Sequence, residues 1–180
     1  MTKGNDTKIT TLPGNLGSHD NVTEYTVAAA RTQLTYPAIQ QCISITGFNA
    51  YGLLGAHVSP GANNKQIAET FKILIEHGGK SYPTWYVVGN FEQHFKWTKV
   101  GWNSTLKIAG AMRDNLGELL TYYSLDTSAV SKGPVNDPWS WGIDIRATHT
   151  TSGVEFAYAK ALGPNTKTFT TIPDVFFIQV

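Results

Sequence analysis

Apolar and polar residues alternate along three segments in the first third of the chain, and each alternation predicts a β-strand. The segments are 22–30, 39–48 and 51–58. A short region containing Gly and Asn separates the second from the third, so these two are predicted to form a hairpin. One side of the hairpin is purely apolar, which indicates that it faces a hydrophobic core. That side carries Ile43, Ile45, Leu54, Ala56 and Val58.

The period changes after the hairpin, and two segments have the spacing of helices. In residues 63–77, apolar side chains recur on one face of a helix. Asn63 can cap its first turn with Gln66 three residues further on, and Gly78 can end it in the left-handed conformation. A weaker apolar stripe predicts a second helix over 104–123, although two glycines lower its helix propensity.

The rest of the chain adds strands and one long loop. A buried strand is predicted between the two helices, a loop rich in Ser, Gly, Pro and Asp follows the second helix, and three strands close the chain. The order of strands, helix, strand, helix and strands predicts an α+β fold. We expect a mostly antiparallel β-sheet or sandwich core flanked by two main helices. These segments are the strand 84–90, the loop 124–140 and the closing strands 141–148, 154–160 and 170–180.

Composition limits the domain organisation and the partners. Residues 1–21 are polar and without periodicity, which predicts a flexible leader, and 22–180 then form one domain. Charged residues make up only 15% of the chain, the net charge is +1, and Lys and Arg form no run, so we expect no nucleic-acid partner. The sequence has no apolar stretch long enough for a membrane span and no signal-peptide pattern, so we expect a soluble protein and no membrane partner.

The hairpin brings one candidate site together. A tight turn centred on Asn49 and Ala50 would pair residues whose numbers sum to 99, which places Cys42 directly opposite His57. Opposed side chains on one face of a sheet lie close enough for a thiol–imidazole contact. Gly55, on the same face, would leave open space beside them. Cys42 is the only cysteine of the chain, so no internal disulfide competes for it.

A thiol beside an imidazole is the arrangement used in nucleophilic catalysis by cysteine. The thiolate is the nucleophile, and a neighbouring histidine favours its formation. Cys42 would attack a carbonyl carbon, and His57 would take the proton and return it to the leaving amine. Ser44 lies on the same face, but a serine needs stronger activation, so it ranks below Cys42. The alternative interpretation is that Cys42 is a small, inert, buried residue.

The segment QQCISITGFNAYGLLGAHVSPG resembles the thiol glutamine deamidases, which include the catalytic domain of cytotoxic necrotizing factor, Burkholderia lethal factor and the bacterial chemoreceptor deamidase. In that family a nucleophilic Cys begins one strand and the His follows on the next. The resemblance implies that Cys42 is the nucleophile and His57 the base. It also implies a third site residue, Thr or a backbone carbonyl, about six residues before the Cys, which makes Thr35 the candidate. Where the family usually has a small residue before the Cys, this chain has Gln41.

The resemblance further implies a deamidase-toxin-like fold and an activity. The chain would be a cysteine-dependent enzyme that converts glutamine to glutamate in a protein substrate, with no cofactor. It would be a bacterial toxin or effector, present in the bacterial cytoplasm before delivery and active in the host cytosol. Transglutamination and peptide hydrolysis use the same residues and stay open.

The residues bear on two other kinds of site. His77, His94 and His149 lack metal-ligand spacing with Cys42 or with each other, so we expect no metal site. Tryptophans in the aromatic segments 95–102 and 138–141 could instead serve a non-enzymatic β-rich domain that binds a protein or a carbohydrate.

Overall fold

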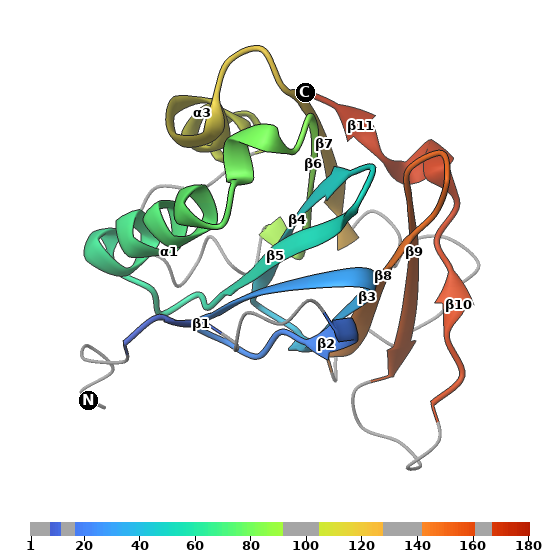
Figure 1. Cartoon of the computed structure of the whole chain (residues 1–180). Coiled ribbons are helices and arrows are strands. Elements are labelled where there is room, and N and C mark those ends of the chain that lie inside the picture. Colours follow the sequence, from blue (N-terminus) through green and yellow to red (C-terminus); the bar gives the residue numbers. More distant parts are fainter. Residues whose placement is uncertain (1–7, 12–16, 92–104, 128–141, 161–166) are drawn as a thin grey trace.

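The computed structural model of the chain describes residues 8–11, 17–91, 105–127, 142–160 and 167–180. Within these residues eleven strands form a single curled sheet, and two α-helices lie together on one side of it (Figure 1). No helix of the described residues is both long and apolar enough to cross a membrane. The sheet and the two helices give the structure the predicted α+β class.

The elements follow one another in the order strands, helix, strand, helix and strands. The helices are α1 (Asn64–Glu76) and α3 (Thr105–Leu116), and 3-10 turns occur at Gly79–Ser81 and Asp174–Phe176. The strands are β1 (Thr10–Thr11), β2 (Gly17–Asn21), β3 (Thr26–Ile39), β4 (Ile43–Asn49), β5 (Gly52–Val58), β6 (Thr84–Gly89), β7 (Thr121–Asp126), β8 (Ile143–His149), β9 (Val154–Lys160), β10 (Thr170–Thr171) and β11 (Ile178–Gln179).

The sheet is mostly antiparallel, as predicted. Its strand order is β10-β9-β8-β3-β5-β4-β6-β7-β11, and β1 and β2 pair with β3 outside this path. Parallel pairing occurs between β6 and β7 and between β3 and each of β1 and β2. The hairpin of β4 and β5 thus lies in the middle of the sheet, with β3 on one side and β6 on the other.

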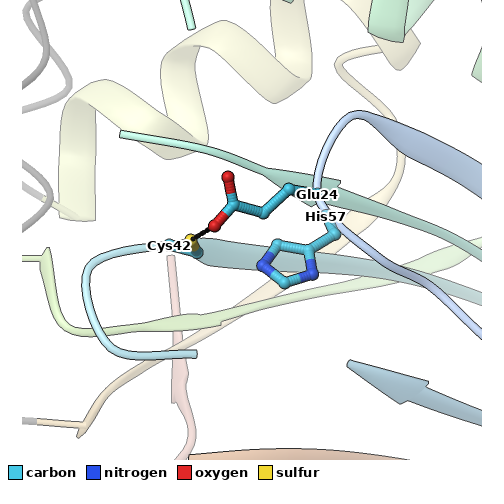
Figure 2. A group of neighbouring side chains, drawn as sticks. All are labelled: Glu24, Cys42 and His57. Carbon is cyan, nitrogen blue, oxygen red and sulfur yellow. Dashed lines mark hydrogen bonds between the residues drawn. The ribbon is translucent and has the colours of Figure 1, made fainter. Parts of the chain in front are cut away.

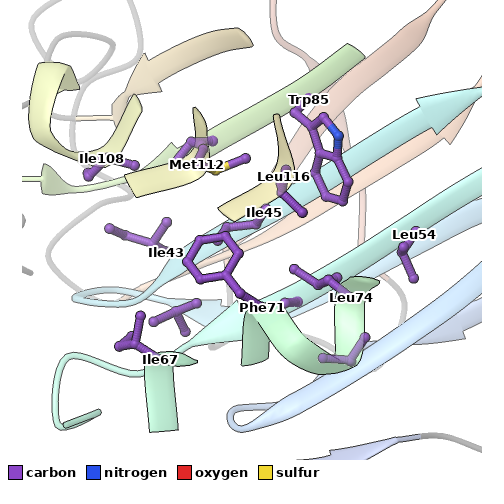
Figure 3. Close-up of a cluster of buried hydrophobic side chains, with 14 of the residues drawn as sticks. Ile43, Ile45, Leu54, Ile67, Phe71, Leu74, Trp85, Ile108, Met112 and Leu116 are labelled. Atoms are coloured by element: carbon purple, nitrogen blue, oxygen red, sulfur yellow. The ribbon is translucent and has the colours of Figure 1, made fainter. Parts of the chain in front are cut away.

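Two hydrophobic clusters cover the two faces of this central hairpin. The first fills the space between the hairpin and the helices (Figure 3) and contains the whole apolar side predicted from the sequence. Helix α1 contributes Ile67, Phe71 and Leu74 to it. The second cluster fills the curl of the sheet on the opposite face and includes Cys42. Because both faces are covered, every residue of β5 is buried.

Helix α1 forms as its sequence predicts. The side chain of Asn63 accepts a hydrogen bond from the N–H of Gln66, and the side chain of Gln66 accepts one from the N–H of Asn63. Two N–H groups that the helix leaves unpaired are satisfied in this way. Gly78 follows with a φ of 82°, in the left-handed region that favours glycine.

The register of the hairpin differs from the prediction by two residues. Asn49 pairs with Gly52, and His57 stands directly opposite Ser44, not Cys42. The turn is centred one residue later because the side chain of Asn49 accepts hydrogen bonds from the N–H groups of Tyr51 and Gly52, at 2.8 and 3.1 Å. A shift of two residues preserves the face of every side chain. Cys42 and His57 are therefore diagonal neighbours on one face.

The segment predicted as the second helix contains a helix and a strand. Helix α3 ends at Leu116, where Gly117 adopts a φ of 142°. Residues 121–126 form β7 in place of further helix, and β7 pairs in parallel with β6 along its whole length. The aromatic and β-branched residues of that segment favour a strand, and the glycine interrupts the helical pattern before it.

The two ends of the chain also differ from the prediction. Residues 17–21, expected within a flexible leader, form β2 and pair with β3. The first strand was expected at 22–30, but β3 begins at Thr26 because the residues before it form a turn. The last predicted strand is divided into β10 and β11, since Pro173 cannot donate a ladder hydrogen bond.

One close contact in the second cluster depends on a glycine. The phenol of Tyr36 crosses from β3 and bonds to the hydroxyl of Thr46 at 2.7 Å and to the carbonyl of Ile45 at 3.0 Å. A Cβ at Gly55 would lie 2.0 Å from the Tyr36 hydroxyl. The space that Gly55 was predicted to leave open is therefore occupied by Tyr36.

We expect Gly55→Ala to lower the free energy of unfolding by about 3 kcal/mol, because the added methyl overpacks a buried site and displaces the Tyr36 hydroxyl. Chemical denaturation measures this change. Gly110→Ala is the matched control: apart from the backbone of α3 and the adjacent residues, no atom of the described residues lies within 4 Å of a Cβ there, so the same substitution should stabilise α3 by up to about 1 kcal/mol. Equal stability of Gly55→Ala and the wild type would contradict the packing described.

Candidate functional site

A tight turn, residues 22–25, joins β2 to β3 and lies against the end of β5. Tyr25 adopts a φ of 61°, a conformation uncommon for residues other than glycine. Its N–H donates a hydrogen bond to the carbonyl of His57 at 3.1 Å. This main-chain contact fixes the 22–25 turn beside β5 and presents Glu24 next to His57.

The imidazole of His57 is held in one orientation and one tautomer. Its Nδ1 lies 2.8 Å from the carbonyl oxygen of Val22. Because a carbonyl can only accept, Nδ1 carries the proton, and Nε2 carries the free lone pair. The side chain is only 2% exposed, and burial lowers the pKa of His57, so the ring is neutral. No atom of the described residues hydrogen-bonds to the buried Nε2.

The thiol of Cys42 is also buried, with 3% of the residue exposed. Its Sγ donates a hydrogen bond to Oε1 of Glu24 at 3.2 Å. Burial raises the pKa of the Cys42 thiol well above its usual value, and the charge of Glu24 and this hydrogen bond raise it further. A main-chain hydrogen bond at Gln41 acts in the opposite direction. The resting sulfur is therefore a protonated thiol.

Glu24, Cys42 and His57 form one compact cluster, which we call the Glu24–Cys42–His57 cluster. One ligand atom from each residue lies within 4.8 Å of the others. In Figure 2 the ring edge of His57 that carries Nε2 is turned towards Cys42 and Glu24. Glu24 is exposed, whereas the other two residues are buried, so the cluster reaches solvent at Glu24. The carboxylate, thiol and imidazole could also serve as metal ligands.

The sequence predicted two of these three residues. Cys42 and His57 come together as predicted, although diagonally and not directly opposite each other. Glu24 was missed, because it was expected in a strand, while its position depends on the 22–25 turn. Glu24 lies between Thr23 and Tyr25, and nothing in this local sequence connects it with Cys42.

Thr35 is connected to this site by a main-chain hydrogen bond to Val22. The carbonyl of Thr35 accepts a hydrogen bond from the N–H of Val22 at 2.7 Å, and the carbonyl of Val22 in turn accepts from His57. The neighbouring Tyr36 points into the second hydrophobic cluster. Since successive side chains of a strand point to opposite faces, the side chain of Thr35 is directed away from that cluster.

Ser44 is the residue directly opposite His57, and it was the second candidate nucleophile. It is fully buried, and its hydroxyl donates a hydrogen bond to the carbonyl of Val88 at 3.1 Å. The hydroxyl is thus committed to the neighbouring strand β6. Cys42 remains the nucleophile that the arrangement of side chains favours.

Other features noted in the sequence lie elsewhere. The aromatic segments 95–102 and 138–141 lie outside the described residues. His149 hydrogen-bonds through Nε2 to the carbonyl of Asn49. The carboxylate of Asp144 accepts hydrogen bonds from the N–H of Ala38 and from the amine of Lys167. Neither Asp144 nor His149 belongs to the Glu24–Cys42–His57 cluster.

An aromatic pocket lies on another part of the sheet. Tyr86, Tyr123 and Phe177 line it together with residues of β9 and β10, and no member of the Glu24–Cys42–His57 cluster does so. Access to Cys42 is therefore separate from this pocket.

No family model and no curated protein matches the chain.

The charge of Glu24 provides a direct test of the state of Cys42. We expect Glu24→Gln to increase the rate of alkylation of Cys42 by iodoacetamide about tenfold at pH 8, since a fall of one unit in the pKa gives about ten times more thiolate. In both proteins the rate of alkylation should rise with pH above 8, because the pKa of the Cys42 thiol is raised and the fraction of thiolate still increases there. Mass spectrometry of metal-free protein at successive times measures the rate.

Glu69→Gln is the matched control, because Glu69 is an exposed glutamate that pairs with Lys72 on α1. Its alkylation rate should equal that of the wild type. A Glu24→Gln rate equal to that of the wild type would mean that the carboxylate does not influence the thiol.

Proposed function

We propose that the chain is a cysteine-dependent glutamine deamidase, in which Cys42 is the nucleophile and His57 the general base. One observation carries the proposal. The buried Nε2 of His57 has a free lone pair, is turned towards Cys42, and has no hydrogen-bond partner among the described residues. A neutral imidazole in this state is ready to accept the proton of a thiol.

The reaction begins when a glutamine carboxamide enters and displaces the carboxylate of Glu24 from the thiol. The proton of Cys42 passes to Nε2 of His57, and the sulfur attacks the carboxamide carbon. The tetrahedral intermediate collapses, the C–N bond breaks, and ammonia leaves with the proton from His57. Water, deprotonated by His57, then hydrolyses the thioester and gives glutamate and the free thiol. The main-chain N–H of Cys42 is the first candidate donor to the oxyanion.

The hydrogen bond between Nδ1 of His57 and the carbonyl of Val22 supports this mechanism. It keeps the lone pair on Nε2 directed at the thiol and stabilises the imidazolium that forms during the reaction. The resemblance to thiol glutamine deamidases implies a third group that is a Thr or a backbone carbonyl. The carbonyl of Val22 is a group of that kind, twenty residues before Cys42 in place of about six.

Glu24 gives the resting enzyme a protected nucleophile. While the thiol donates to the carboxylate, the sulfur carries its proton and reacts slowly with small electrophiles. A substrate that replaces the carboxylate removes both the hydrogen bond and the nearby charge. Deamidation is favoured over transglutamination and peptide hydrolysis by the resemblance in the segment from Gln40 to Gly61.

The same resemblance supports the biological role. We propose that the enzyme is a bacterial toxin or effector that modifies a host protein and acts in the host cytosol. Its partner is then a folded protein that presents a glutamine side chain.

The activity is tested by incubating host-cell protein with the metal-free enzyme in heavy-oxygen water. Wild type should convert a glutamine to a glutamate that carries the heavy oxygen, and Cys42→Ser and His57→Ala should not. Mass spectrometry identifies the site. His77→Ala, which changes an exposed histidine at the end of α1, should act like the wild type.

A second measurement does not require the natural substrate. A chloromethyl ketone analogue of glutamine should alkylate Cys42 faster in wild type than in His57→Ala, because His57 assists thiolate formation. Labelling that is equally slow in both proteins, together with no converted glutamine, would contradict the proposal.

Thr35 has a separate expected outcome. Because its contribution is a main-chain carbonyl bonded to Val22, Thr35→Val should retain kcat/KM within about twofold, a difference well below 1.4 kcal/mol. Steady-state kinetics on the identified substrate measures it. A loss as large as that of His57→Ala would instead give the Thr35 side chain a direct catalytic role.

A further inference from the structure

The Glu24–Cys42–His57 cluster also has the composition of a zinc site. It contributes one oxygen, one sulfur and one nitrogen donor, all within 4.8 Å of one another. Zinc in proteins is bound by these three kinds of side chain. Each residue comes from a different segment of the chain: Glu24 from the 22–25 turn, Cys42 from the position just before β4, and His57 from β5. All three converge at one point (Figure 2).

The second observation is the unpartnered nitrogen of His57. Nε2 is buried, and no described residue satisfies its lone pair. A buried polar atom without a partner costs free energy, so such an atom in a folded protein calls for an explanation. A cation between Nε2, the sulfur of Cys42 and the carboxylate of Glu24 would supply the missing partner.

The surroundings of His57 match those of a metal ligand. A histidine that binds a metal through one nitrogen usually donates its other N–H to a carboxylate or a backbone carbonyl. In this structure Nδ1–H donates to the carbonyl of Val22 at 2.8 Å. The ring is therefore already in the tautomer and orientation in which Nε2 can coordinate a metal.

We propose that the Glu24–Cys42–His57 cluster binds one Zn²⁺ ion through Sγ of Cys42, Nε2 of His57 and a carboxylate oxygen of Glu24. The thiol proton is released to solvent when the ion binds, and the sulfur coordinates as a thiolate. Two anionic ligands and one neutral ligand balance the charge of the ion, which favours a site that is mostly buried. Three protein ligands leave the fourth tetrahedral position to water.

The distances are compatible with this arrangement. Bond lengths of about 2.0–2.3 Å at a tetrahedral angle place ligand atoms about 3.3–3.6 Å apart. The sulfur of Cys42 and Oε1 of Glu24 are 3.2 Å apart, and the longest separation in the cluster is 4.8 Å or less. A movement of about 1 Å closes the site. The exposed side chain of Glu24 gives the ion a path from solvent.

The donor set favours zinc over the hard cations. Thiolate and imidazole are ligands for zinc and related transition metals, whereas magnesium and calcium prefer oxygen donors. This inference does not depend on the proposed deamidase activity, although the two use the same atoms. Zinc would occupy the lone pair of Nε2 that has to accept the thiol proton and would lower the nucleophilicity of the sulfur, so zinc would inhibit a deamidase that uses Cys42.

The test uses the full chain after treatment with a chelator, and it measures binding without a substrate. Addition of Co²⁺ should produce the charge-transfer absorption of a cobalt–thiolate bond, saturating at one ion per chain, and Zn²⁺ should displace it. Competition of Zn²⁺ with a chromophoric chelator gives the affinity. Bound Zn²⁺ should also protect Cys42 from iodoacetamide.

Variants assign the ligands. Cys42→Ser should abolish the charge-transfer band, and His57→Ala and Glu24→Gln should each weaken zinc binding by more than about tenfold, since even groups that only support a ligand cost 10–100-fold. His77→Ala is the matched control and should bind like the wild type. Circular dichroism confirms that each variant is folded, and the protection experiment needs only the wild-type chain.

The outcomes separate the two proposals. No cobalt–thiolate band and no protection of Cys42 in the wild type would overturn the zinc site and leave the deamidase untouched. Zinc binding that survives Cys42→Ser and His57→Ala, or that is unchanged in Glu24→Gln, would also overturn this ligand set. Zinc binding in a chain that, when metal-free, converts no glutamine and is labelled at Cys42 as slowly as His57→Ala would support the zinc site and contradict the deamidase.

Discussion

The hydrogen bond from Nδ1 of His57 to the carbonyl of Val22 connects the sheet to the turn that completes the site. β5 carries His57 in the centre of the sheet, and the 22–25 turn carries Glu24. A second bond, from the N–H of Tyr25 to the carbonyl of His57, links the same two segments. Together these bonds determine which nitrogen of the imidazole is free, where it points, and where the carboxylate lies. Without them Cys42 would be an ordinary buried cysteine just before β4.

Both proposals depend on the lone pair of Nε2, and they assign it different partners. In the deamidase the lone pair receives the proton of the thiol, and in the zinc site it binds the ion. These uses exclude each other, since each also consumes the sulfur of Cys42. The carboxylate of Glu24 opposes the first use, because its negative charge disfavours a thiolate, and supports the second, because it adds an anionic ligand. The negative charge of Glu24 therefore favours Cys42 as a metal ligand over Cys42 as a nucleophile.

The sequence predicted the parts of the fold that rest on local pattern. Helix α1 follows from its apolar spacing and its Asn63 cap, and β9 has the predicted bounds. The apolar side of the hairpin was also assigned correctly, because alternation survives a register shift of two residues. The parts that failed depend on tertiary contacts. β7 was read as helix because its apolar residues also fit a helical stripe, and only its pairing with β6 makes it a strand.

The candidate site divides in the same way. The proximity of Cys42 and His57 could be predicted because the two strands of a hairpin pair in sequence order, so residue numbers indicate which side chains lie close together. Glu24 could not be predicted as a member of the cluster, because it reaches the cluster through a turn with a positive φ at Tyr25. A tyrosine does not indicate such a conformation. The space beside Gly55 was predicted to be open, but Tyr36 arrives from another strand and fills it. Long-range side-chain contacts of this kind leave no periodic pattern in a sequence.

Val22 contributes to the site with its main chain alone. Its carbonyl fixes His57, while its side chain packs in the second hydrophobic cluster. Any residue of similar size and polarity could supply the same carbonyl, so natural selection on the site would not hold the amino-acid type at this position constant. Related chains could therefore share the complete site and still differ at residue 22. A search for the site by sequence motif would detect Cys42 and His57 and overlook the carbonyl that orients His57.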